Sequence, residues 1–295
     1  ASNSYISLPA ALGNASIESI TASDESGKIN INYAPYNLMR RLLYHCGITP
    51  QSTANTLATN IVNYRTSNWF NTMEEIKQVT GMTDAYFDLI DQDITVYSWV
   101  NQDVMRPPDL PTDPPVPRAS ININTASLNV LKAVLKTATP GYDNDRINEI
   151  ATAIKNQRDT QLPFTHMFSS YATQTNDTQS FAAFIEDLSV TDLTADRKNS
   201  MRNVADGSYY NRELSGDPNQ NWFENDDAGG VEFCYYAHTF LIESTGRSGN
   251  IERTVIQTYG STYNYSTYTF DSEGELVLPT YIGESSPKPY WREEH

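Results

Sequence analysis

One short segment occurs twice in this chain and constrains the fold more than any other feature. Residues 29–32 read Ile-Asn-Ile-Asn, and the same four residues return at 121–124. After each copy, apolar residues recur at spacings of three and four, which indicates an amphipathic helix. These residues are Leu38, Leu42 and Leu43 in the first copy and Leu128, Leu131, Val134 and Leu135 in the second. We therefore predict a duplicated helical unit whose two copies share a core.

The match continues through a second predicted helix in each copy, over 54–64 and 146–157. Each of these helices ends near an arginine, and a phenylalanine follows after a short polar turn. The matched residues are Arg65 and Phe70 in the first copy and Arg158 and Phe164 in the second.

The last asparagine of each repeated segment is a candidate helix cap. We expect Asn32 and Asn124, or Thr125 beside it, to lie near helix N-termini. Side-chain oxygens at such positions accept hydrogen bonds from backbone N–H groups that have no partner within the helix.

The first copy continues with a helix, a glycine turn and another helix. A short helix over 71–80 ends at Gly81, and Thr83 or Asp84 caps a second helix over 85–90. This pattern resembles helix-hairpin-helix and SAM-like modules. The alternating, β-branched residues 94–98 then predict a strand.

The rest of the chain divides into segments of different composition. Six prolines make 105–118 an extended connector between the two copies. Residues 200–230 have no sustained period and predict a long surface loop. Residues 231–244 predict one long strand, 246–250 a hairpin turn, and 251–259 the partner strand.

These segments predict an α+β fold in which a sheet built from both chain ends receives a large helical insertion. We assign residues 1–32 and 201–260 to the sheet, with an acidic loop in the second segment. The helical modules cover 33–104 and 119–200, and a Tyr- and Pro-rich tail covers 261–295.

The charge of the chain excludes several classes of partner. Lys and Arg number 20 and Asp and Glu 36, which gives a net charge of −16. Such a charge argues against nucleic acid or an anionic lipid surface as the main partner. A nucleic-acid-binding helix-hairpin-helix protein is the weakest alternative, because Lys77 is the one cation near the predicted hairpin and acidic residues surround it.

Residues for catalysis are scarce. The four histidines are scattered, and the chain has no G-x-S-x-G, P-loop or H-E-x-x-H motif. An exported hydrolase that uses acidic residues remains the alternative enzyme, and it needs two carboxylates that face each other across a pocket. Cys46 and Cys234 are compatible with a disulfide or with two buried thiols.

One acidic loop has the composition of a cation site. Residues 215–227 contain four carboxylates, which are Asp217, Glu224, Asp226 and Asp227. Calcium takes about six to eight oxygen ligands, which a flexible Asp- and Asn-rich loop can supply. A solvated acidic surface loop is the alternative. Smaller groups are found at Asp143 and Asp145 and at Asp271, Glu273 and Glu275.

Taken together, the motifs resemble the minor pseudopilin K family of type II secretion, also called general secretion pathway protein K. The resemblance rests on 24–32, on 70–76 with 81–83, on 121–127 with Val130 and Leu131, and on the strands from 240 to 255. It covers roughly residues 20 to 260. The tail after 260 goes beyond the family pattern.

The resemblance implies a non-enzymatic protein with a pilin-like sheet, an inserted helical domain and an N-terminal membrane helix. Its expected place is the tip of the periplasmic pseudopilus, anchored in the inner membrane, with minor pseudopilins I and J as partners and a secreted substrate as a further contact. We expect the present chain to begin after the membrane helix. Calcium is known in this family, which favours the loop at 215–227 over the other acidic groups.

Overall fold

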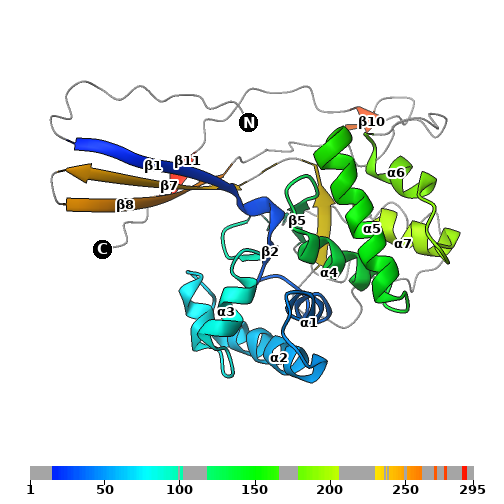
Figure 1. Cartoon of the computed structure of the whole chain (residues 1–295), viewed down its shortest axis with the longest axis horizontal. Helices are drawn as coiled ribbons and strands as arrows, with labels where there is room; N and C mark the ends of the chain where they lie inside the picture. The colour runs from blue at the N-terminus through cyan, green and yellow to red at the C-terminus, as the bar shows by residue number, and fades with distance from the viewer. Residues whose placement is uncertain are drawn as a thin grey trace. The chain divides into compact units, whose positions relative to one another are not determined.

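The computed structural model describes two units of the chain (Figure 1). One unit combines residues 1–24 with 238–295, and the other covers Glu25–Ala237. The described residues are 15–98, 100–101, 118–165, 179–205, 230–235, 237, 239–248 and 251–260, with short strands at 269–270, 276–277 and 288–290.

The first unit is an antiparallel sheet built from both ends of the chain. Its strand order is β1-β7-β8-β11. The strands are β1 (Ala15–Asp24), β7 (Thr239–Ser248), β8 (Ile251–Gly260) and β11 (Lys288–Tyr290), and β9 (Thr269–Phe270) pairs separately with β10 (Leu276–Val277). The insertion of the helical unit between β1 and β7 confirms the predicted α+β architecture.

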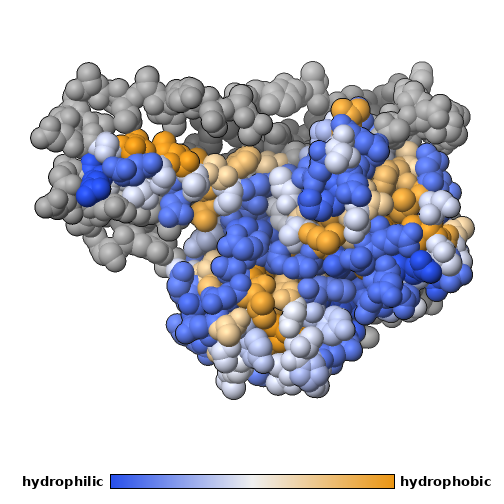
Figure 2. Space-filling model, viewed as in Figure 1, coloured by the Kyte–Doolittle hydropathy of each residue, from blue (hydrophilic) through white to orange (hydrophobic). Residues whose placement is uncertain are grey.

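Part of this sheet exposes apolar side chains. In the β1–β7 register Asp24 lies opposite Phe240 and Ile20 opposite Ser244, so Ile20 and Phe240 share one face. Both are about two-fifths exposed, at 43% and 40%. Figure 2 shows hydrophobic side chains gathered over β1 and β7.

Two predictions about the C-terminal strands are wrong in detail. Residues 231–244 form two strands, because β6 (Gly230–Cys234) pairs within the helical unit and β7 pairs within the sheet. The hairpin turn does not begin at Gly246, since β7 continues to Ser248 with Gly246 opposite Arg253. The strand does not require a glycine there, since an added Cβ would lie 3.6 Å from Ser16 O, which is an ordinary van der Waals distance.

The boundary between the units also differs from the predicted one. Residues 25–32 and 201–237, which we assigned to the sheet, belong to the helical unit. The physical reason is strand pairing. β2 (Ile29–Asn30) pairs in parallel with β3 (Ile94–Thr95), and β6 pairs in parallel with β5 (Arg118–Asn122).

The first helical module begins with η2 (Glu25–Gly27) and β2. Its helices are α1 (Tyr36–His45), α2 (Gln51–Ser67), the 3-10 helix η3 (Glu74–Gln78) and α3 (Asp84–Ile90), after which β3 closes the module. The predicted apolar faces are buried, with Leu38, Leu42 and Leu43 on α1 and Leu57 and Ile61 on α2.

The second module follows β4 (Val100–Asn101), which pairs with β5. Its helices are α4 (Leu128–Ala138), α5 (Asn144–Asn156), the π-helical turn η4 (Gln157–Gln161), α6 (Phe181–Asp187) and α7 (Ala195–Ala205). Residues 200–205 are therefore helical rather than part of a loop. The apolar pattern of α7 is too short to predict a helix, since its buried apolar residues among those described are Met201 and Val204.

The two modules share one core, as the repeat predicts. Helices α1 and α4, which follow the two copies of Ile-Asn-Ile-Asn, pack against each other. Leu131 on α4 is fully buried in this core, together with Leu43 and Met39 of α1.

Candidate functional site

The repeated segment is buried in both modules, and it begins as a strand and ends in a turn. All four isoleucines, Ile29, Ile31, Ile121 and Ile123, are fully buried. The Ile31 amide donates to Thr95 O at 3.0 Å, and the Ile123 amide donates to Cys234 O at 2.8 Å. Strand β6 therefore pairs in parallel with the repeated segment of the second module, as β3 pairs with that of the first, although β6 lies more than one hundred residues beyond β5.

The asparagine that follows each strand holds a distant loop through two hydrogen bonds. Asn32 accepts from Phe70 N at 3.0 Å and donates to Phe70 O at 2.9 Å. Asn124 makes the same pair with Phe164, at 2.9 and 2.7 Å. We call each pair an amide clamp, and both clamped phenylalanines are buried.

The predicted capping role of these asparagines is therefore wrong. The α1 N-cap is Pro35, which has no side-chain cap. The α4 N-cap is Ser127, which accepts from Val130 N at 3.1 Å. Residues between each asparagine and its helix displace the side chain from the helix end, and it pairs with the phenylalanine backbone instead.

The matched arginines complete the arrangement. Arg65 donates to Ile31 O at 2.8 Å and to Ala34 O at 2.6 Å, and Arg158 donates to Ile123 O. The repeated strand therefore satisfies its backbone through the parallel partner and the arginine, and its asparagine anchors the phenylalanine loop. Burial lowers the pKa of Arg158, and Asp159 opposes this change.

Each module also contains a helical hairpin, and the second one is not predicted from the sequence. Residues 79–83 read Val-Thr-Gly-Met-Thr, and residues 190–194 read Val-Thr-Asp-Leu-Thr. In the first hairpin Thr83 caps α3 by accepting from Tyr86 N at 3.2 Å. In the second, Thr194 accepts from Arg197 N at 3.4 Å. The two loops therefore start their helices in the same way.

The second hairpin lacks the glycine that marks the first, because an aspartate takes its place. Gly81 has a φ of 88°, and Asp192 at the matching position has a φ of 59°. Glycine adopts this left-handed conformation without steric cost, and aspartate is among the residues that tolerate it. The Val-Thr-x-Leu/Met-Thr pattern is the signal that could have found the hairpin without its glycine.

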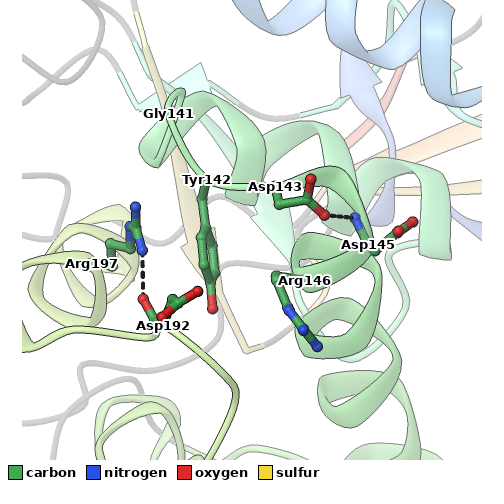
Figure 3. Close-up of a pocket in the computed structure, with 7 residues that line it drawn as sticks. All are labelled: Gly141, Tyr142, Asp143, Asp145, Arg146, Asp192 and Arg197. Atoms are coloured by element: carbon green, nitrogen blue, oxygen red, sulfur yellow. Dashed lines mark hydrogen bonds between the residues drawn. The ribbon is translucent and has the colours of Figure 1, made fainter.

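A pocket lies beside each hairpin, at the start of the second helix of its module. The first pocket has a volume of about 240 Å³ and is lined by uncharged residues, namely Ser52, Thr53, Thr56, Leu57, Asn60 and Gly81. The second has a volume of about 450 Å³ and is largely charged, being lined by Gly141, Tyr142, Asp143, Asp145, Arg146, Asp192 and Arg197 (Figure 3).

The acidic side chains of the second pocket lie among two arginines and a tyrosine. Asp143 caps α5 by accepting from Asp145 N at 2.8 Å. The guanidinium of Arg197 lies 4.4 Å from the centre of the Tyr142 ring and also donates to Asp192 O. In Figure 3, Tyr142 stands between Arg197 and Arg146.

The first hairpin is poorly suited to a phosphate. Lys77 pairs with Asp84 at 3.5 Å and lies 4.5 Å from the centre of the Phe87 ring. The Asp84 side chain is 85% exposed and presents a negative charge where a phosphate would approach. This arrangement opposes the backbone contacts that nucleic-acid binding requires.

Cys46 and Cys234 are buried thiols rather than a disulfide pair. Cys46 donates to Asp93 Oδ2 at 3.1 Å, and Asn129 of the second module donates to the same oxygen at 3.0 Å. Burial raises the pKa of the Cys46 thiol, and the Asp93 charge raises it further. Asp93 thus joins the two modules, and the thiol stays protonated.

The predicted calcium ligands Asp217, Glu224, Asp226 and Asp227 lie outside the described residues, as does the acidic group at 271–275. Within the described part of the chain, no three His, Cys, Asp or Glu side chains gather as metal ligands would. The same part contains no helix long and apolar enough to cross a membrane.

A comparison with known protein families matches residues 24–95 to the helix-hairpin-helix motif. The first module is a helix-hairpin-helix module. This result confirms the interpretation of its hairpin, and the second module repeats several of its hydrogen bonds.

Two further comparisons concern the chain as a whole. No curated protein matches it. Among solved structures, it is similar to a chain in the GspK-GspI-GspJ complex of the type 2 secretion system from enterotoxigenic Escherichia coli. The sequence identity is 10% and the TM-score is 0.46, over 97% of this chain and 82% of that chain.

The amide clamp can be tested by a substitution in the helix-hairpin-helix module. Asn32→Ala removes two hydrogen bonds and leaves the buried backbone of Phe70 unpaired. We expect the free energy of unfolding, measured by urea titration, to fall by about 2–4 kcal/mol. Asn63→Ala, on the exposed face of α2, is the matched control and should change it by less than about 0.5 kcal/mol. Equal losses in the two variants would contradict a clamp at Asn32.

Proposed function

We propose that this chain is the periplasmic part of a minor pseudopilin of the K type, a non-enzymatic component of a type II secretion pseudopilus. The observation that carries this proposal is the architecture. An antiparallel sheet uses both chain ends and is interrupted after its first strand by two helical modules, the first of which matches the helix-hairpin-helix motif. The sequence motifs that resemble the pseudopilin K family fall on the elements that define this architecture.

The charge distribution favours this role over nucleic-acid binding. The chain carries a net charge of −16, and the cation beside the first hairpin is already paired with Asp84. Helix-hairpin-helix modules in this setting serve as a scaffold that presents surface to other proteins. We propose a location at the tip of the pseudopilus, with anchoring in the inner membrane through a segment that precedes these residues.

The proposed partners are minor pseudopilins I and J, which we expect to contact the sheet unit rather than the helical unit. The reason is the exposed apolar face that contains Ile20 and Phe240. A few well-packed side chains near the centre of an interface contribute most of the binding energy. Contact with a secreted substrate is a further proposed role of the tip complex.

The partner proposal can be tested by co-purification with the two pseudopilins. Ile20→Arg combined with Phe240→Arg should reduce the amount recovered by about tenfold or more, because each change places a charge in an apolar contact. The matched control is Trp69→Arg with Leu89→Arg, which changes two exposed apolar residues of the helical unit. Thermal melts should show that both variants fold. Loss of binding only in the Trp69 and Leu89 variant would contradict the proposal.

We also propose that calcium binds the acidic loop at 215–227. Asp217, Glu224, Asp226 and Asp227 would supply carboxylate oxygens, which are the ligands calcium prefers. Bound calcium would offset the repulsion among these four side chains.

The calcium proposal predicts a higher melting temperature in millimolar calcium than in a chelator. A ligand at a hundredfold excess over Kd stabilises the folded state by about 2.7 kcal/mol. Magnesium should stabilise less, because it requires stricter octahedral geometry. Asp217→Ala and Asp226→Ala should each remove most of the difference, whereas Asp88→Ala, on the exposed face of α3, should preserve it. Superimposed melts in calcium and chelator would show a solvated acidic loop.

A further inference from the structure

The pockets of the two modules lie at matching positions, and they differ in charge. Ser52 and Thr53, the second and third residues after the α2 N-cap, line the first pocket. Asp145 and Arg146 take the same positions after the α5 N-cap and line the second. We call the pocket of the second module, shown in Figure 3, the charged pocket.

One arginine of the charged pocket is held in place on two sides. The guanidinium of Arg197 lies 4.4 Å from the centre of the Tyr142 ring and donates to Asp192 O. Tyr142 is itself fixed, because it is only 2% exposed and its hydroxyl donates to Thr191 O at 2.6 Å. No carboxylate of the described residues forms an ion pair with Arg197. A guanidinium carries five N–H donors in a rigid fork that matches a carboxylate, so Arg197 can bind an anionic group with little further loss of freedom.

Three exposed aspartates line the same pocket. Asp143 Oδ1 accepts from Asp145 N at 2.8 Å, and neither these two side chains nor that of Asp192 forms an ion pair with a described residue. The arginine on α5, Arg146, is already paired with Glu149 at 3.0 Å. The lining then keeps one arginine against three aspartates, which gives a net charge of 1 − 3 = −2.

The arrangement of the aspartates favours an organic cation over a metal ion. Across the residues that the structure describes, no three acidic, His or Cys side chains gather as metal ligands would. Separated carboxylates suit a ligand whose cationic groups are also separated. The volume of about 450 Å³ lies within the range of about 300–1,000 Å³ that is typical of small-molecule sites.

We propose that the charged pocket binds a small organic ligand with one carboxylate and two ammonium groups, which is the chemistry of a free basic amino acid such as lysine. The carboxylate pairs with Arg197, and the ammonium groups pair with Asp143 and Asp192. An inorganic anion lacks the cations that the aspartates need, and a diamine lacks the carboxylate that Arg197 needs, so both leave charges of the pocket unpaired. This inference does not depend on the pseudopilin proposal.

Isothermal titration calorimetry of the full chain with L-lysine tests the proposal. We expect one saturable site. Cadaverine, which lacks the carboxylate, and Nα-acetyl-lysine, which lacks the α-ammonium group, should each bind about tenfold or more weakly, because each has lost one of the paired charges.

Three substitutions remove single charges of the pocket. Arg197→Gln should abolish the preference for lysine over cadaverine, because it removes the partner of the carboxylate. Asp143→Asn and Asp192→Asn should each raise the Kd of lysine about tenfold. Asparagine still caps a helix and still tolerates the left-handed backbone, so these two changes preserve the structural roles of the aspartates.

The first hairpin supplies matched controls. Lys77→Gln and Asp84→Asn remove the same two kinds of charge there and should change the Kd of lysine by less than about twofold. Thermal melts of every variant show whether it folds. If Arg197→Gln lowers the melting temperature, the two aspartate variants decide the outcome, since both keep the Arg197 side chain.

Several results would overturn the proposal. The absence of saturable heat at about 10 mM lysine would show that the pocket does not bind it. Cadaverine that binds as tightly as lysine would show a general attraction of cations to an acidic chain. Equal weakening by Asp84→Asn and Asp192→Asn would show an effect of net charge, and an unchanged Kd in both pocket aspartate variants would place the ligand elsewhere.

Discussion

The helical unit depends on a buried strand whose polar groups must all be paired inside the core. An unpaired backbone N–H or C=O in such a place costs about as much as a lost hydrogen bond. Both modules pair these groups through the same three interactions. A parallel strand receives the amide of Ile31 or Ile123, Arg65 or Arg158 donates to the carbonyl of the same isoleucine, and the adjacent asparagine clamps the phenylalanine loop. The helices then pack around a strand that cannot shift without breaking these bonds.

The two modules share this internal frame and differ where they meet solvent. Their hairpins have the same caps, but Gly81 is replaced by Asp192, and the pocket beside the hairpin changes from uncharged to charged. At the contact between modules, Asp93 accepts from Cys46 and Asn129, and a Cβ at Gly27 would lie only 2.6 Å from Thr125 Oγ1. The two modules therefore form one compact unit, in which the repeated hydrogen bonds are the same and the surface residues differ. This division suits a scaffold that presents protein surfaces, as we propose.

Local patterns were sufficient to predict the helices and their buried faces. The period of 3.6 residues predicts α1, α2, α4 and α5, and the repeat aligns Arg65 with Arg158 and Phe70 with Phe164, which make matching hydrogen bonds in the structure. Long-range pairing was not predictable in this way. The assignment of β6 to β5 depends on a partner far along the chain, and a continuous run of apolar and β-branched residues at 231–244 does not show where the chain passes from one unit to the other. The role of Asn32 was missed because its partner, Phe70, lies 38 residues away. The predicted calcium ligands lie outside the described residues and stay a prediction.

Native-state hydrogen exchange at Ile123 tests most directly whether the repeated segment is paired in both modules. The amide of Ile31 is paired with Thr95 and that of Ile123 with Cys234, so the account predicts that both exchange slowly and that the amides of Phe70 and Phe164 share this protection. Slow exchange at Ile31 together with exchange at Ile123 as fast as in an exposed loop would contradict it. That result would mean that β6 does not close the second module and that the chain contains one complete module rather than two.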